Sequence, residues 1–392
     1  MKIAWFCIPA QGHTNPTLGL VRYVVEAGHQ VTYFSFERFR QAIQATGAQF
    51  VACDDYGDFD LGLDERESSD RSGKDLAFAT HLLVQSSLAI EGPALEALKE
   101  LQPDLVVGDS MATWAKLLAK KLNLPYVCSN TTFAFNKESS RYMRQSIWAL
   151  LKLLWSMPSI NRELNRLRER GYEIGSVLDL IQNDEATPTM VYTSPYFQPC
   201  WDSFGSNYRF IGPSIRPVEK PYPKTRAKTI YVSLGTVVHN EDFYRAVIDA
   251  FRDLPDYQVI IALGQSELSD WQDLPDHIEI HDRVDQMAVL AIADVFITHC
   301  GMNSASEGLY HQVPLILCPQ TPEQGAVAKR TAELGAGYWL KFMTPSAIRR
   351  AVLTVLQEPH YRDAAGRVAK SFKASGGYQE ALAFMEQVAQ NT

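Results

Sequence analysis

A histidine and an aspartate each follow an apolar run that has the character of a buried strand. His13 lies in the segment AQGHTNP, directly after the run at residues 3–9, and Asp109 ends the run at residues 105–108. A neutral imidazole can remove the proton of a hydroxyl group near neutral pH, because its ordinary pKa is about 6.5. A neighbouring carboxylate fixes the tautomer and stabilises the imidazolium that forms. The pair therefore predicts general-base chemistry.

Both residues of this pair also have a simpler interpretation. The alternative for His13 is that it only satisfies backbone groups in a turn. Asp109 precedes a predicted helix that begins near Ala112, and an aspartate or serine at such a position commonly caps the helix. Ser110 can take the capping role instead, which leaves Asp109 available for His13.

A second candidate site lies where a predicted strand at residues 295–298 gives way to a turn of small residues and then a helix. The segment THCGMNSASEG occupies residues 298–308. Backbone amides at the start of a helix bind phosphate groups. Taken alone, the pattern is that of any glycine-containing turn, so an anion site here needs support from the rest of the chain.

Alternating strand and helix patterns must position these loops. Strand-like runs in the first half lie at residues 3–9, 30–35 and 105–108, with a helix predicted over 16–27, and those of the second half lie at 229–233, 258–262, 295–298 and 314–318. Between the halves, RPVEKPYPKTRAK at 216–228 has three prolines and no apolar periodicity, which is typical of a linker. We expect an α/β protein with two Rossmann-like domains, residues 1–215 and 229–392, facing across a cleft. The last helical pattern, residues 364–390, would cross back to the first domain.

Composition narrows the classes of function. The chain has 392 residues, of which 46% are apolar, and a formal net charge of -8. A protein that binds nucleic acid through the phosphate backbone needs an excess of Lys and Arg, so nucleic acid is not an expected partner. No apolar run approaches the roughly 18 residues of a membrane span, and the start MKIAWFCIPA does not resemble a signal peptide. We expect a cytoplasmic protein whose six scattered cysteines are free thiols.

The segment at residues 283–324 resembles the donor-binding signature of UDP-dependent glycosyltransferases with the GT-B fold. The matching positions are His299 to Glu307, then Pro314, Pro319 and the pair Glu323 and Gln324. The segments at 10–16 and 233–236 (SLGT) and Asp109 match the same superfamily in the same order. The resemblance therefore covers both halves, and within the superfamily it is nearest to bacterial macrolide and flavonoid glycosyltransferases.

The resemblance implies a role for each matching residue. His13 would be the general base on the acceptor hydroxyl, with Asp109 as its carboxylate partner. The diphosphate of the donor is expected to contact His299, Gly301, Asn303 and Ser304, together with Ser233 or Thr236. Glu307 is expected to bind the ribose, and Glu323 and Gln324 the hexose. The uracil is expected to contact Arg283 and Val284. The glutamine that ends the signature, Gln324, suggests glucose as the hexose.

The activity that the resemblance implies is that of an inverting, metal-independent hexosyltransferase. It would move glucose from UDP-glucose to a hydroxyl of a small lipophilic acceptor, with no cofactor besides the UDP-sugar. Asp58-Phe59-Asp60 has the form of a DxD metal motif, but it sits in an acidic loop with no preceding strand. The alternatives are a sugar-nucleotide epimerase or hydrolase of the same shape and a non-catalytic sugar-nucleotide-binding partner. The presence of both His13 and Asp109 argues against them.

Apolar residues in the first half are candidates for the acceptor pocket. They are Met111, Trp114, Phe133 and Phe135, whose alternative role is in the core. A longer helical pattern at residues 142–167 places apolar residues at helical spacing before a basic run at 162–170. We expect this helix to wall the acceptor pocket. The alternative is a peripheral membrane contact, because a basic amphipathic helix can lie on anionic lipid.

Overall fold

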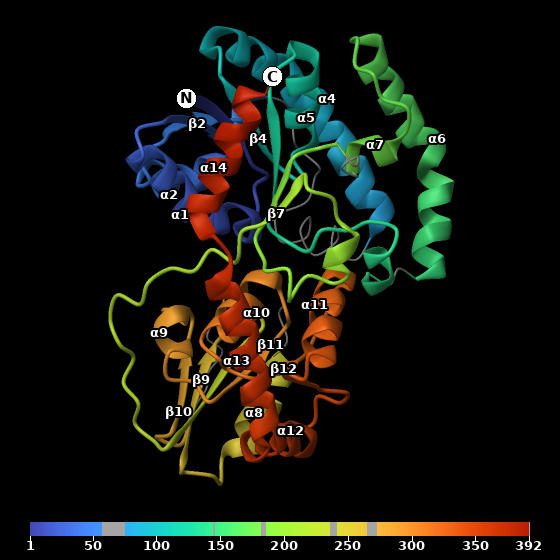
Figure 1. Cartoon of the computed structure of the whole chain (residues 1–392). Coiled ribbons are helices and arrows are strands. Elements are labelled where there is room, and N and C mark those ends of the chain that lie inside the picture. Colours follow the sequence, from blue (N-terminus) through green and yellow to red (C-terminus); the bar gives the residue numbers. More distant parts are fainter. Residues whose placement is uncertain (57–74, 144–145, 182–185, 236–240, 265–272, 392) are drawn as a thin grey trace.

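The computed structural model describes residues 1–56, 75–143, 146–181, 186–235, 241–264 and 273–391 (Figure 1). Two predicted features, Thr236 and the DxD segment at 58–60, lie outside these residues. The first half of the chain forms a seven-stranded sheet in the order β3-β2-β1-β4-β5-β6-β7, in which all neighbours are parallel. Its strands are β1 Lys2–Phe6, β2 Gln30–Ser35, β3 Gln49–Ala52, β4 Leu105–Asp109, β5 Tyr126–Asn130, β6 Thr189–Val191 and β7 Tyr208–Phe210.

The second half forms a six-stranded parallel sheet in the order β10-β9-β8-β11-β12-β13. Its strands are β8 Lys228–Ser233, β9 Tyr257–Ala262, β10 Ile278–His281, β11 Val295–Thr298, β12 Leu315–Leu317 and β13 Gly337–Trp339. Most of these strands read as continuous apolar runs because helices cover both faces of each sheet; β4, for example, is buried at every position. The predicted α/β architecture is confirmed.

Helices connect and cover the strands. In the first half they are α1 Gln11–Glu26, α2 Arg40–Gln44, α4 Leu76–Leu101, α5 Thr113–Leu122, α6 Ile147–Glu169 and α7 Val177–Ile181. In the second half they are α8 Glu241–Phe251, α9 Gln286–Leu290, α10 Met302–Tyr310, α11 Pro322–Glu333, α12 Pro345–Gln357, α13 Pro359–Ala374 and α14 Gly377–Gln390. No helix among the described residues is both long enough and apolar enough to cross a bilayer.

The predicted helical pattern at residues 364–390 is two helices that serve different halves. Helix α13 ends at Ala374, and the chain turns at Gly377, which has a φ of 59° and donates its N–H to the carbonyl of Ile211 at 2.9 Å. Beyond this turn, α14 packs on α1 and on β4, β5 and β7 of the first half, where Phe384 and Met385 join the core (Figure 1). The C-terminal helix thus ties the second half of the chain to the first sheet.

Some predicted boundaries are wrong by several residues. The first strand ends at Phe6 instead of residue 9, and the first helix begins at Gln11 instead of residue 16. His13 therefore lies in the first turn of α1, and Pro16 lies inside the helix. The linker prediction of residues 216–228 overlaps β8 by one residue, because β8 begins at Lys228.

Candidate active site

His13 and Asp109 come together at the carboxyl ends of two neighbouring strands, β1 and β4. Their atoms Nδ1 and Oδ2 lie 2.8 Å apart. The Asp109 side chain is fully buried, whereas that of His13 is 20% exposed. Because the carboxylate holds Nδ1 as the protonated nitrogen, Nε2 becomes the nitrogen that can accept a proton. The geometry is that of an oriented general base.

The surroundings hold this pair in place and favour the charged imidazole. Asp109 Oδ1 accepts the backbone N–H of Met111 at 2.9 Å, and Thr131 Oγ1 lies 3.4 Å from His13 Nδ1. Burial opposes a charge on His13. The attraction and hydrogen bond of Asp109, with a further attraction from Glu323, outweigh burial and raise the pKa of His13 above its ordinary value. A raised pKa makes the neutral imidazole a stronger base.

The turn that carries His13 is also bonded to the second half of the chain. Pro16 has no N–H, so it cannot donate to the carbonyl of Gly12 four residues earlier in α1. That carbonyl accepts a hydrogen bond from Asn303 Nδ2 at 2.9 Å. The predicted role of Asn303 was a contact of its backbone amide with the diphosphate. Its side chain, at the start of α10, joins that helix to the residue before His13.

Helix α10 begins without a side-chain cap. Its N-cap residue is Gly301, and the preceding residue, Cys300, has a left-handed φ of 67° that turns the chain between β11 and α10. A positive φ is uncommon for a residue other than glycine. The first-turn amides, which include those of Asn303 and Ser304, are left for an external acceptor such as a phosphate group.

His299 lies under this turn between two glycines. A Cβ atom at Gly301 would stand 2.5 Å from His299 Nε2, and one at Gly235 would stand 2.7 Å from its Cε1. Burial lowers the pKa of His299 to about 4, although the backbone of Ser233 opposes this effect. His299 is therefore neutral at physiological pH. Its Nδ1 is buried without a hydrogen-bond partner in the described part of the chain.

Glu307, predicted to bind the ribose, faces a glutamine that the sequence analysis missed. Gln286 Nε2 donates to Glu307 Oε2, and its Oε1 accepts the hydroxyl of Tyr231 at 3.0 Å. Burial raises the pKa of Glu307, while Gln286 and the nearby Arg216 guanidinium oppose the rise. Ser304 Oγ lies 3.4 Å from the same Gln286 nitrogen. Carboxylate, amide and hydroxyl groups thus meet beside the start of α10.

The residues predicted for uracil lie at the entrance to α9. Arg283 is exposed and Val284 is half-buried against the core. The next residue, Asp285, caps α9 by accepting the N–H of Met287, and it lies 3.9 Å from the guanidinium of Arg216. This turn directly precedes Gln286. The residues predicted to contact the uracil are therefore adjacent in the chain to a residue that pairs with the predicted ribose contact, Glu307.

The residues predicted for the hexose begin α11. Gln324 is part of a capping box with Thr321, and its Oε1 accepts the backbone N–H groups of Gln320 and Thr321 at 2.8 and 3.2 Å. Capping occupies the amide oxygen, so the NH₂ group is the part of Gln324 suited to a ligand. Glu323 is exposed and near enough to His13 to raise its pKa.

Two of the four predicted acceptor residues are core residues. Trp114 and Phe133 are 2% and 1% exposed. Trp114 belongs to the core cluster on one face of the first sheet, and Phe133 packs against Phe197. The prediction that they line a pocket is corrected to their alternative role. Met111 and Phe135 are half-buried and keep a surface that a ligand can contact.

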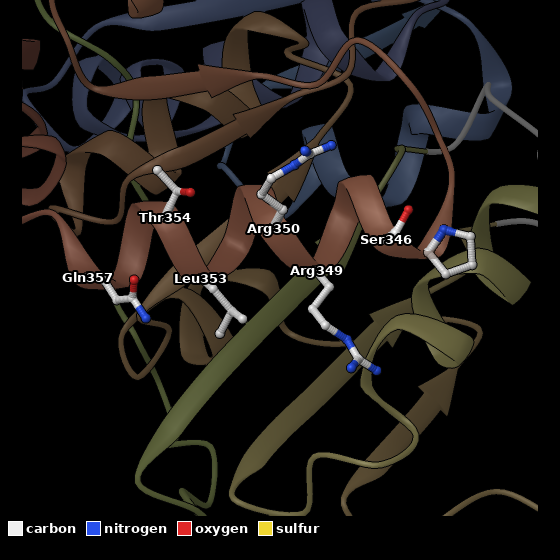
Figure 2. Close-up of a pocket in the computed structure, with 7 residues that line it drawn as sticks. Ser346, Arg349, Arg350, Leu353, Thr354 and Gln357 are labelled. Carbon is white, nitrogen blue, oxygen red and sulfur yellow. The ribbon is translucent and has the colours of Figure 1, made fainter.

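A hollow of about 590 Å³ lies elsewhere among the described residues, along α12. None of the predicted site residues lines it. Figure 2 shows Arg349 and Arg350 pointing in opposite directions from this helix. Arg349 is engaged within the second half, because its Nε donates to the carbonyl of Ala250 at 2.6 Å and its guanidinium pairs with Asp253. The groups along α12 do not converge on a common point, so this hollow has no features of a reactive site.

Comparison with known proteins identifies the class. A family model described as "Erythromycin biosynthesis protein CIII-like, C-terminal domain" matches residues 245–387. NDP-glycosyltransferase YjiC of Bacillus licheniformis is 33% identical over 97% of this chain and 95% of its own. The chain belongs to the bacterial natural-product glycosyltransferases. Oleandomycin glycosyltransferase of Streptomyces antibioticus is 26% identical to this glycosyltransferase over 98% of the chain and 90% of its own.

Solved structures agree with this assignment. The glycosyltransferase of kitacinnamycin is 26% identical, with a TM-score of 0.84 over 99% of this chain and 98% of its own. The calicheamicin glycosyltransferase is 28% identical, with a TM-score of 0.80 over the same shares. The GT-B fold predicted for this glycosyltransferase is confirmed.

Proposed function

We propose that this glycosyltransferase moves a hexose, with glucose as the first candidate, from a UDP-sugar to a hydroxyl of a small lipophilic acceptor such as a flavonoid or macrolide. The observation that carries the proposal is the hydrogen bond between His13 and a fully buried Asp109. An epimerase or hydrolase acting on the donor alone does not need a base aimed at an acceptor. The name of one relative supports the donor: the UDP-glucosyltransferase YdhE of Bacillus subtilis, whose name also marks it as uncharacterized, is 32% identical over 95% of this chain.

The proposed reaction is a direct displacement. His13 Nε2 takes the proton of the acceptor hydroxyl, and Asp109 stabilises the imidazolium. The acceptor oxygen bonds to the anomeric carbon from the side opposite the diphosphate, and the bond from that carbon to the phosphate oxygen breaks. UDP leaves with the bonding electrons, and the configuration inverts. The uncapped start of α10 stabilises the charge that grows on the diphosphate, so the proposed step needs no metal.

Other groups are proposed to bind the donor. Glu307 and Gln286 offer an acceptor and a donor of hydrogen bonds to the ribose hydroxyls, and neutral His299 offers a ring nitrogen to the diphosphate. Glu323 and the NH₂ group of Gln324 are proposed for the hexose. The turn at Arg283 and Val284 is proposed for the uracil, and Met111 and Phe135 for the acceptor.

The test is incubation of the purified protein with UDP-glucose, EDTA and a panel of flavonoids and macrolides, followed by mass spectrometry. The wild type is expected to give a hexose adduct with a β linkage by NMR. His13→Ala is expected to lose about 100-fold or more of the rate. A matched control, His360→Ala, changes a surface histidine that pairs with Glu358 and is expected to keep the rate. Transfer only with added metal, an α linkage, or full activity of His13→Ala would each contradict the proposal.

A further inference from the structure

One face of α6 leaves large apolar side chains in solvent. The exposed fractions are 74% for Ile147, 80% for Trp148, 64% for Leu154 and 90% for Trp155. Leu150 and Leu151 are 45% and 44% exposed. An apolar face of this kind is unusual on a protein surface and marks a place where something else binds. Figure 1 shows α6 at the edge of the molecule, with its far side uncovered by any drawn helix or strand.

This exposure is not the result of a loosely attached helix. The opposite face of α6 packs on α4 and buries Ile160, Leu164 and Leu167. The contact is reinforced by His81 of α4, whose Nδ1 lies 3.0 Å from Glu163 Oε2 and whose Nε2 lies 2.9 Å from Ser159 Oγ. The helix is therefore held in one orientation, with a buried face and an exposed face.

The exposed face changes from apolar to basic along the helix. We define the α6 face as Ile147, Trp148, Leu150, Leu151, Leu154 and Trp155 in the first turns with Asn161, Arg162, Asn165 and Arg166 in the later turns. Of the two acidic side chains in α6, Glu163 is half-buried against His81, and Glu169, the last residue of the helix, is exposed beyond the two arginines. The whole chain carries a formal charge of -8, so the basic part of this face is opposite in sign to the net charge of the protein.

We propose that the α6 face docks on the surface of an anionic phospholipid bilayer. Tryptophan rings suit the boundary between lipid head groups and acyl chains, and exposed aliphatic side chains next to them gain by burial there. Arg162 and Arg166 lie on the same face, where they can meet anionic head groups. This placement would bring the glycosyltransferase to the phase in which lipophilic molecules collect. The inference concerns a surface and does not depend on the donor or on the role of His13.

The test is co-sedimentation of the full chain with vesicles of phosphatidylglycerol and, separately, of phosphatidylcholine. We expect the wild type to bind phosphatidylglycerol vesicles with a blue shift of tryptophan fluorescence, and to bind more weakly in high salt. Trp148→Ser with Trp155→Ser is expected to lower binding by about tenfold or more. Arg162→Gln and Arg166→Gln are each expected to lower binding to phosphatidylglycerol by about fivefold.

A matched control is Phe342→Ser, which removes a side chain that is 68% exposed in the other half of the chain. It is expected to bind vesicles like the wild type, and circular dichroism would show that every variant is folded. The proposal is overturned if the wild type binds neither kind of vesicle. It is also overturned if the tryptophan variants bind like the wild type, if they abolish a dimer seen by ultracentrifugation without changing vesicle binding, or if they raise only the KM of an acceptor.

Discussion

The carboxylate of Asp109 acts on the reaction by setting the protonation of His13. The base works when neutral, so kcat/KM rises as pH increases through the pKa of His13, which Asp109 holds above its ordinary value. Asp109→Asn removes the charge that contributes most to that rise, and it leaves burial, which lowers the pKa, opposed mainly by the weaker attraction of Glu323. We expect the rising limb of the pH profile to move to lower pH. The plateau is expected to fall by about 100-fold or more, because a less basic imidazole in an unfixed tautomer abstracts the proton more slowly.

The control for this experiment is Asp104→Asn. Asp104 directly precedes β4, the strand that Asp109 ends, and its carboxylate accepts the backbone N–H of Lys2 at 2.7 Å instead of contacting His13. The Asp104→Asn variant should keep the rising limb of the pH profile of kcat/KM at the wild-type pH. If the limb of Asp109→Asn stays in place or moves to higher pH, His13 is not the group that titrates.

Some site residues could be predicted from the sequence, and others could not. The pairing of His13 with Asp109 could be anticipated, because both residues follow strands of one parallel sheet. Gln286 could not, since its partner Glu307 is 21 positions away on another helix and no spacing rule joins them. Trp114 and Phe133 show the converse: apolar residues after strands serve equally well as core or as pocket, and only packing decides between them.

At the scale of helices and strands, the pattern of apolar residues predicted the elements better than their ends. Pro16 is typical of the first turn of a helix, so the sequence predicts that α1 starts there. In the structure the helix begins earlier, and the carbonyl that Pro16 leaves without a helical donor is bonded by Asn303 from the second half. A contact between the two halves therefore supplies the hydrogen bond that is missing inside the helix. No pattern in the sequence around Pro16 predicts this contact.

The crossing of α14 over α1 depends on a glycine. A Cβ atom at Gly19 would stand 2.1 Å from Tyr378 Oη, and this hydroxyl lies 2.6 Å from Ser214 Oγ. We expect Gly19→Ala to lower the free energy of unfolding by about 1–3 kcal/mol, because Tyr378 must move and its hydrogen bond is strained. The measurement is urea unfolding followed by circular dichroism.

The matched control is Gly92→Ala in α4, where no neighbouring atom lies within 4 Å of the added Cβ. This change should raise stability by about 0.5–1 kcal/mol, since alanine is the better helix former. Adding Tyr378→Ala to Gly19→Ala should recover part of the loss. Equal effects of the two glycine variants would show that α1 and α14 are not in close contact.

At the scale of the whole molecule, the two halves are joined by polar contacts as well as by α14. Arg330 of α11 donates from Nη2 to the carbonyl of Tyr196 at 2.7 Å and from Nε to that of Phe197 at 3.1 Å. Close by, Tyr142 donates its hydroxyl to Glu333 at 2.6 Å. These bonds lie on a different part of the interface from the bond between Asn303 and Gly12. The halves therefore meet at more than one place, which restricts how they can move relative to each other.

We expect Arg330→Ala to weaken the coupling between the halves. Losing hydrogen bonds from a charged donor to two carbonyls costs about 2 kcal/mol. Because each half has its own sheet and core, the unfolding transition in calorimetry should broaden or divide into two. Arg349→Ala is the matched control, since Arg349 also donates to a backbone carbonyl but joins α12 to Ala250 within the second half. It should lower the stability of that half without changing how the halves unfold together. If Arg330→Ala unfolds in the same single transition as the wild type, the halves are held together by α14 and the apolar contacts alone.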